Sequence, residues 1–300
     1  MIDNRSQFEI LTFLERKRPE ICTLRQIADG TNLSLNLVES TRKVLNQRGW
    51  VYSKLSKIGI TDSGILALEP YRVKKATILA AGFGSRMMPA TADKPKPLVT
   101  INGKRIIDTL LDALVAVDIH DITIIRGYHK KSFDSLLEKY PFLHFIDNDE
   151  YNKTNNISSA ILAKDVLTEG SYLCEADLFI TNPDIICKYQ YSSNILGSFS
   201  LQTDDWSFKM DDSGHIKEYK KGNTFCWNYY GISYWTAEDC KKLNHDWEEI
   251  FKVDKDIFWE QVPLQLKKEN YAVEIRPCRK QDIIEIDNYY ELAMLDPSYQ

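Results

Sequence analysis

The residue types and spacing most suggestive of chemistry lie in one window, "LAAGFGSRMMPATADKPKPL", which runs from Leu79 to Leu98. Gly82 and Gly84 let backbone N–H groups approach an anion with no Cβ in the way. Arg86 adds a fork-shaped cation suited to phosphate oxygens. Lys96 stands between two prolines, whose fixed φ limits where its ammonium can reach. The window therefore predicts a binding site for a polyphosphate.

Two common phosphate-binding motifs do not fit this window. No GK[ST] follows the glycines, so it is not a Walker loop, and a dinucleotide fingerprint would need glycine where Met87 stands. The apolar run before Gly82 is typical of a buried strand. The loop should then lie at the carboxyl edge of a parallel sheet, where open α/β sheets bind ligands.

Carboxylates at two other strand ends could hold a magnesium ion beside this loop. Asp177 ends "YLCEAD", and Asp287 ends "DIIEID". Mg²⁺ is commonly held by one or two carboxylates together with phosphate oxygens, so both aspartates are candidate ligands. Glu175 and Glu285 lie two residues earlier, on the same side of each strand. They are either part of the site or ordinary strand-end carboxylates.

Aromatic residues gather late in the chain, where five of the six tryptophans follow residue 200. An aromatic cage with a carboxylate binds an ammonium group well. The same residues could instead pack the core or a subunit contact, and composition alone favours that second interpretation.

The elements that would position these residues change character near residue 70. Helical patterns cover Ser6–Arg18, the stretch capped by Thr23 and the stretch capped by Ser34. Two short strand-like pieces flank Lys54–Lys57, and a helix follows from Asp62. This layout, with "ITDSGILAL", resembles a winged helix-turn-helix. We therefore expect a small α+β winged-helix domain over residues 1–72.

From residue 73 to residue 300, strands alternate with helices, which predicts right-handed βαβ units and a mostly parallel sheet. Among the expected helices is "KKSFDSLLEKY". After about residue 190 the pattern becomes more β-like, and "YAVEIRP" is expected as a late strand. The fold class is therefore α/β.

Composition is that of a globular protein with a net charge of −5. Residues 1–75 carry 13 Lys and Arg against 8 Asp and Glu, whereas the other 225 residues carry 25 against 35. No apolar run is long enough to span a membrane, the N-terminus is charged, and no cysteines form a CxxC pair. We expect a cytoplasmic protein with free thiols and no zinc site.

The window from Leu79 to Leu98 resembles the signature of the nucleotidyltransferase superfamily that makes nucleotide sugars and CDP-alcohols. The matching residues include "LAAG", Gly84, Arg86 and "PKPL". The resemblance extends over residues 76–295 and implies a Rossmann-like sheet that binds a nucleoside triphosphate with Mg²⁺. It implies that Lys96 and Arg86 neutralise the triphosphate, and that Asp177 and Asp287 hold the metal.

Four later segments resemble the bacterial phosphocholine cytidylyltransferase branch. They are "DNDEYNKTNNISSAILAKDVL", "YYGISYWT", "KVDKDIFWEQVPLQLKK" and "IIEIDNYYEL". Two positions differ from this branch: Glu175 stands where aspartate is usual, and Phe258 where tyrosine is usual. The branch implies transfer of CMP from CTP to phosphocholine, phosphoethanolamine or 2-aminoethylphosphonate.

The resemblance also implies specific binding residues. The nucleotide would contact Leu79, Ala80, Ala81, Gly82, Gly84, Ser85, Gly127, Tyr128 and Asn156. The acceptor would be enclosed by Trp206, Trp235, Trp259 and Tyr230.

Two alternative functions stay open. One is a sugar-1-phosphate nucleotidyltransferase, because the glycine loop serves both branches. The other is a transcriptional regulator whose second domain only senses a ligand. In that case Arg42, Lys43 and Arg48 could contact DNA phosphates, with Asn36 or Asn46 at bases. The N-terminal domain could equally mediate self-association, and we expect a homo-oligomer.

Overall fold

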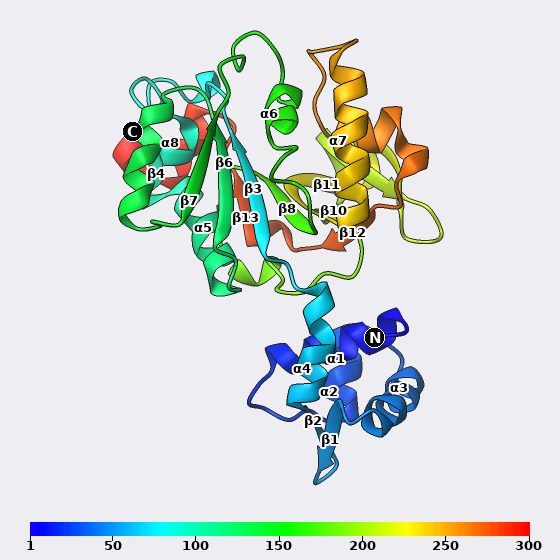
Figure 1. Cartoon of the computed structure of the whole chain (residues 1–300). Helices are drawn as coiled ribbons and strands as arrows, with labels where there is room; N and C mark the ends of the chain where they lie inside the picture. Colours follow the sequence, from blue (N-terminus) through cyan, green and yellow to red (C-terminus); the bar gives the residue numbers. More distant parts are fainter. The chain divides into compact units, whose positions relative to one another are not determined.

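The computed structural model describes residues 1–300, which form two compact units (Figure 1). The first unit comprises Met1–Arg72 with Tyr189–Tyr191, and the second comprises Val73–Lys188 with Ser192–Gln300. No pattern in the sequence predicts that residues 189–191 join the first unit. No helix has both the length and the apolar character that crossing a membrane requires.

The first unit contains four helices and a hairpin. In chain order these are α1 (Arg5–Arg16), α2 (Leu24–Thr31), α3 (Leu35–Gln47), β1 (Val51–Lys54), β2 (Lys57–Ile60) and α4 (Asp62–Leu68). Local chemistry explains the helix starts. Thr23 and Gln26 form a reciprocal capping box on α2, and Ser34 accepts a hydrogen bond from the backbone N–H of Leu37 on α3.

The core of this unit buries Phe8, Leu11 and Leu14 of α1, at the spacing of one helix face. Tyr191, from the inserted segment, stacks on Tyr71 with ring centroids 5.6 Å apart. The element order is the one expected from the sequence. The winged-helix assignment stays a prediction.

Helix α3 carries less free positive charge than its sequence suggests. Arg42 donates two hydrogen bonds to Glu39, at 2.9 and 2.8 Å, and Arg48 pairs with Asp3. Lys43 also lies 3.9 Å from Glu39. DNA binding and self-association by this unit both stay predictions. The ion pairs of Arg42, Lys43 and Arg48 leave less positive charge for DNA phosphates.

The second unit is built on a seven-stranded sheet in the order β12-β10-β11-β8-β3-β6-β7. Its strands are β3 (Lys75–Ala80), β6 (Asp121–Arg126), β7 (Leu143–Asp147), β8 (Ser171–Glu175), β10 (Asn194–Met210), β11 (Ile216–Trp235) and β12 (Glu274–Pro277). The β3–β6, β6–β7, β3–β8 and β10–β12 pairs are parallel, so the predicted mostly parallel sheet is confirmed. Short pairs join β4 (Thr100–Ile101) to β5 (Lys104–Arg105), and β9 (Leu178–Ile180) to β13 (Ile283–Glu285).

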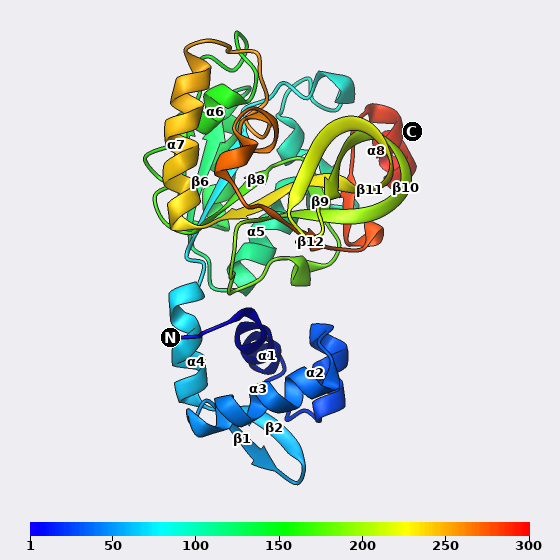
Figure 2. The same cartoon turned by 90° about the vertical axis from the view of Figure 1, so that its right-hand side faces the viewer.

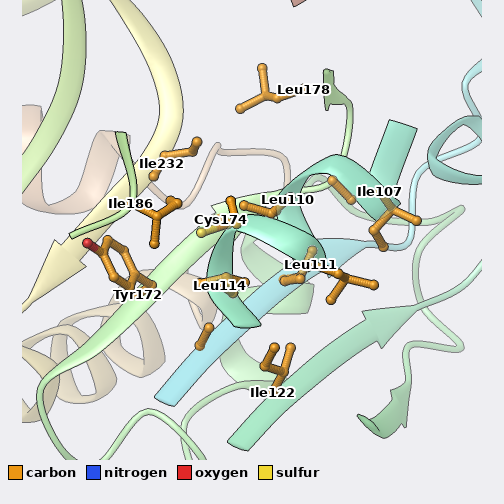
Figure 3. Packing of buried hydrophobic residues seen from close by; sticks show 14 of the residues in the cluster. Ile107, Leu110, Leu111, Leu114, Ile122, Tyr172, Cys174, Leu178, Ile186 and Ile232 are labelled. Carbon is orange, nitrogen blue, oxygen red and sulfur yellow. The ribbon is translucent and has the colours of Figure 1, made fainter. Parts of the chain in front are cut away.

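Helices cover both faces of this sheet (Figure 2). They are α5 (Ile106–Ala116), α6 (Ile157–Leu162) and α7 (Ala237–Phe251), and α8 (Tyr289–Leu295) lies near the C-terminus. Strand alternation produces the two cores: Ile78 and Ala80 pack on the α5 side, whereas Leu79 packs with α6 and α7. Figure 3 shows Leu110, Leu111 and Leu114 of α5 in the first core.

One element differs from the sequence prediction. Residues Lys130–Glu138, expected as an α-helix, form 3-10 turns in which only Phe133 and Leu136 are buried. These two buried side chains lie three positions apart, and the apolar face they form is too narrow for an α-helix. The β10–β11 pair is a long, curved ribbon, and its bulges bring Ser207 opposite both Lys220 and Asn228.

Candidate active site

A pocket of about 910 Å³ opens at the carboxyl ends of β3 and β8. It is lined by the glycine loop, the segment around Asn156, the end of β8 and part of the β10–β11 ribbon. This volume is near the upper end of the range for small-molecule sites. The pocket therefore has room for a nucleotide together with a second substrate.

The glycine loop is held in one conformation by its own residues. Gly84 has a φ of +60°, and a Cβ there would lie 2.8 Å from the Cβ of Lys96. The hydroxyl of Thr91 donates to the carbonyl of Gly84 at 2.9 Å. A larger residue at Gly84 would both strain the backbone and displace Lys96.

Each candidate catalytic cation pairs with a candidate metal ligand. The Nζ of Lys96 lies 2.9 Å from Oδ2 of Asp177, and Arg86 lies 3.0 Å from Oδ1 of Asp287. Lys96 is only 7% exposed, whereas the Arg86 side chain is 71% exposed. Lys96 is therefore fixed within the pocket, and Arg86 is free to move toward a ligand.

The expected metal ligands lie in a larger group of carboxylates. Oxygens of Asp205, Glu285 and Asp287 lie within 4.8 Å of one another. Asp177 Oδ1 is buried and has no hydrogen-bond partner. Burial raises the pKa of Glu285 to about 8, with the charges of Asp177 and Asp287 adding to the shift. This oxygen-rich group fits a hard divalent cation such as Mg²⁺.

A second carboxylate pair, Glu175 and Glu260, also lines the pocket. Burial raises the pKa of Glu175 well above its usual range, and the nearby charge of Glu260 raises it further. Burial also raises the pKa of Glu260, to about 7. Tyr229 donates to Glu175 and Tyr219 donates to Glu260, each at 3.3 Å.

Aromatic rings enclose this carboxylate pair. Trp206, Tyr229 and Phe258 all line the pocket. The ring of Trp206 stacks on Tyr219 at 4.7 Å and meets Phe258 nearly edge-on at 6.1 Å. Carboxylates between aromatic walls favour an organic cation.

Comparison with known proteins bears on this arrangement. A family model described as nucleotidyl transferase matches residues 75–205. A 2-aminoethylphosphonate cytidylyltransferase from Lancefieldella rimae is 38% identical over 232 residues, which cover 75% of this chain and 92% of that protein. This chain belongs to the nucleotidyl transferase family. It is an enzyme of that family, as its sequence predicted.

Other relatives of this nucleotidyltransferase are also cytidylyltransferases. A choline-phosphate cytidylyltransferase from Streptococcus pneumoniae is 30% identical over 230 residues, covering 74% of this chain and 96% of that protein. The solved structure of a CTP:phosphocholine cytidylyltransferase from Streptococcus pneumoniae matches with a TM-score of 0.69 and 28% identity. It covers 76% of this chain and 100% of that structure.

Most of the predicted site residues of the nucleotidyltransferase do converge on the pocket. Those that line it are Leu79, Ala80, Ala81, Gly82, Gly84, Ser85, Arg86, Lys96, Asn156, Asp177, Trp206 and Asp287. Their contacts with substrates stay predictions.

Three of the four expected acceptor-binding residues lie elsewhere. Trp235 is fully buried. It pairs with Ser171, the first residue of β8, whereas Glu175 is the last residue of that strand. Tyr230 is also buried and faces the α5 core, where its hydroxyl lies 3.0 Å from that of Ser198. Tyr229, one residue earlier, points to the opposite face of β11 and lines the pocket instead.

Trp259 is likewise a core residue and only 1% exposed. Its backbone N–H donates to Oδ1 of Asn156 at 2.8 Å, which directs the preceding Phe258 to the pocket. The prediction that Trp235, Trp259 and Tyr230 enclose the acceptor is therefore wrong. The adjacent residues Tyr229 and Phe258 line the pocket in place of Tyr230 and Trp259.

Gly127 and Tyr128 support the glycine loop without lining the pocket. The backbone N–H of Tyr128 donates to the carbonyl of Ala81 at 3.1 Å, and its hydroxyl donates to the carbonyl of Thr91 at 3.1 Å. This geometry does not favour direct contact between these two residues and a nucleotide.

Several lining residues were not predicted as site residues. Among them are Phe83, Tyr151, Asp205, Lys221, Tyr229, Phe258 and Glu260. Glu260 follows the conspicuous tryptophan of "FWEQV", and its burial could have been suspected only from that apolar context. Nothing in the sequence marks Lys221, because several lysines surround it.

Proposed function

We propose that this enzyme transfers CMP from CTP, with Mg²⁺, to a small acceptor that carries a phosphonate or phosphate at one end and an ammonium at the other. The observation that carries the proposal is the carboxylate pair Glu175 and Glu260, which lines the same pocket as the glycine loop and as the aromatic residues Trp206, Tyr229 and Phe258. Two neighbouring carboxylates with raised pKa values are stabilised by a cation between them. A sugar phosphate supplies no such cation.

The acceptor nitrogen that fits best is a primary ammonium. Oε2 of Glu260 is buried and has no hydrogen-bond partner, and the residue is 3% exposed. A primary ammonium donates three hydrogen bonds, whereas a trimethylammonium donates none and would leave that oxygen unsatisfied. The relative with 38% identity is a 2-aminoethylphosphonate cytidylyltransferase. We therefore propose 2-aminoethylphosphonate as the preferred acceptor, ahead of phosphocholine.

The two cations of the glycine loop have a defined task in this reaction. An acceptor oxygen attacks the α-phosphorus of CTP, and the bond from that phosphorus to the bridging oxygen of pyrophosphate breaks. Lys96 and Arg86 neutralise the charge that develops on the departing pyrophosphate. Because both cations already pair with Asp177 and Asp287, they can exchange those carboxylates for phosphate oxygens.

Asp177 and Asp287 are the residues we propose to hold Mg²⁺, with Asp205 and Glu285 close by. When bound, the ion would neutralise phosphate charge and orient the phosphate oxygens. No side chain need form a covalent intermediate, since the acceptor is itself an anionic nucleophile.

The acceptor series tests this proposal. We expect the highest kcat/KM for 2-aminoethylphosphonate, followed by phosphoethanolamine and then phosphocholine, with CTP and Mg²⁺. Equal kcat/KM for the primary and quaternary amines would contradict the assigned role of Glu260, while leaving CMP transfer itself intact.

The acidity of Glu260 predicts a pH dependence. Above about pH 7 this carboxylate is charged and attracts the acceptor ammonium; below it, the carboxyl is neutral. We expect kcat/KM for the acceptor to fall by up to about tenfold per pH unit below pH 7. The acceptor's own second ionisation near ~6 also contributes. Glu260→Gln provides the control. In this variant the fall in kcat/KM near pH 7 should disappear, while the pH dependence from the acceptor's own ionisation should remain.

Lys221 is the third cation in the pocket and, unlike Lys96 and Arg86, it has no carboxylate in ion-pair contact. It lies across the strand pair from Trp206. We expect Lys221→Ala to raise KM for the acceptor by about 10- to 100-fold, through loss of a charged contact to its phosphonate. KM for CTP should change little. Lys220→Ala is the matched control, since Lys220 pairs with Glu218 and does not line the pocket.

A further inference from the structure

The lining of the active-site pocket includes neutral polar residues as well as carboxylates. Asn148, Tyr151, Thr154, Ser158 and Ser159 line it and carry no charge, and we call these five residues the neutral polar wall. This wall joins the carboxyl end of β7 to the start of α6. A neutral nucleobase loses less solvation there than among carboxylates. If the phosphates follow the glycine loop, the base can lie against this wall.

Two aromatic rings, those of Phe83 and of Tyr151 in the neutral polar wall, form a corner in the pocket. Phe83, between the two loop glycines, is 44% exposed and lines the pocket. Its ring centroid lies 5.1 Å from that of Tyr151, with the planes tilted by 55°. A flat ring entering this corner can stack on one aromatic face while meeting the other ring edge-on, and both contacts are favourable.

The corner is held in place before any ligand binds. Tyr128 also packs on Phe83, with ring centroids 5.3 Å apart, and its hydroxyl donates to the Thr91 carbonyl. Gly127 leaves room for Tyr151, because a Cβ there would lie 2.7 Å from both that ring and the carbonyl oxygen of Ala81. A site formed in advance avoids the cost of ordering its side chains on binding.

We infer that Phe83 and Tyr151 form the stacking wall for the base of the nucleotide donor. This inference rests on the proposed function, since it requires a nucleoside triphosphate in the pocket. Stacking acts on the face of a base and not on its hydrogen-bonding edge. The wall therefore sets affinity for the nucleoside, while choice between bases depends on other groups.

Isothermal titration of the full chain with two probes, both as Mg²⁺ complexes, tests the inference. CTP carries the base, and inorganic tripolyphosphate lacks it. We expect Phe83→Leu and Tyr151→Leu each to weaken CTP binding by about 5- to 100-fold, because leucine keeps apolar bulk but has no aromatic face. Tripolyphosphate should bind each variant as it binds the wild type. Tyr151→Phe, which keeps the ring, should bind CTP normally.

Two results would overturn the inference: unchanged CTP affinity in both leucine variants, or an equal loss of tripolyphosphate affinity, which would show a disturbed phosphate loop. Phe225→Leu is the control for an exposed phenylalanine outside the pocket, at 71% exposure. CMP transfer by the wild type is measured alongside. An enzyme that binds CTP through the corner yet transfers nothing would refute the proposed function and leave the inference standing.

Discussion

Replacing Lys96 with alanine should reduce kcat by about 10²- to 10³-fold or more while leaving the protein folded. Lys96 is the buried cation of the glycine loop, held between Pro95 and Pro97 and directed at Asp177. Without it, the departing pyrophosphate loses its fixed positive partner, and Asp177 adds an unpaired negative charge nearby. Steady-state pyrophosphate release and a thermal unfolding curve measure the two effects.

Lys94→Ala is the matched control for this variant, because Lys94 lies two residues away and is exposed, with only a 3.8 Å contact to Asp93. It should retain nearly wild-type kcat. Near-normal turnover by a folded Lys96→Ala protein would remove Lys96 from the reaction. A variant with no cooperative unfolding transition would be replaced by Lys96→Met, which keeps the stem that packs beneath Gly84.

Replacing Asp177 with asparagine should lower Mg²⁺-dependent turnover by about a thousandfold and weaken the apparent affinity for Mg²⁺. The substitution keeps the size of the side chain but removes its negative charge. Oδ1 of Asp177 is buried and has no hydrogen-bond partner in the protein. Turnover is measured against Mg²⁺ concentration at saturating CTP and acceptor.

Asp212→Asn, in the exposed turn of the β10–β11 ribbon, is the control and should leave the Mg²⁺ dependence unchanged. If Asp177→Asn gives the wild-type Mg²⁺ curve, Asp177 is not a ligand. The carboxylates near Asp287 would then be the metal site by themselves.

That the glycine loop and Asp177 line one pocket could be predicted from the sequence because the pattern that marks them is local. Gly82, Gly84, Arg86 and Lys96 lie within 15 residues, so their joint purpose depends little on the rest of the fold. To predict the position of Asp177, it was enough to assume that its strand ends beside the loop. Strand β8, which Asp177 follows, does pair with β3.

The aromatic residues that line the pocket could not be predicted individually, because the outcome depends on which side of a strand or turn faces the pocket. Tyr229 and Tyr230 are chemically alike, but alternation along β11 places them on opposite faces. Phe258 lines the pocket and Trp259 does not, and the backbone N–H of Trp259 donates a hydrogen bond to Asn156, which lies more than 100 residues away in sequence. Such a long-range contact leaves no pattern in the local sequence.

The two-unit organisation was predictable in outline from the change of pattern near residue 70. The insertion of Tyr189–Tyr191 into the first unit was not, because a three-residue segment has no periodicity of its own. Its contribution is tertiary, through the stacked pair Tyr71 and Tyr191.

The measurement that tests the central claim most directly is pyrophosphate release from CTP and Mg²⁺ with either 2-aminoethylphosphonate or glucose-1-phosphate as the acceptor. The carboxylate pair Glu175 and Glu260, with its aromatic walls, predicts rapid release with the aminophosphonate and little with the sugar phosphate. Release only with glucose-1-phosphate would place the enzyme in the sugar branch. No release with either acceptor, although CTP binds, would contradict catalysis and favour a ligand-sensing protein.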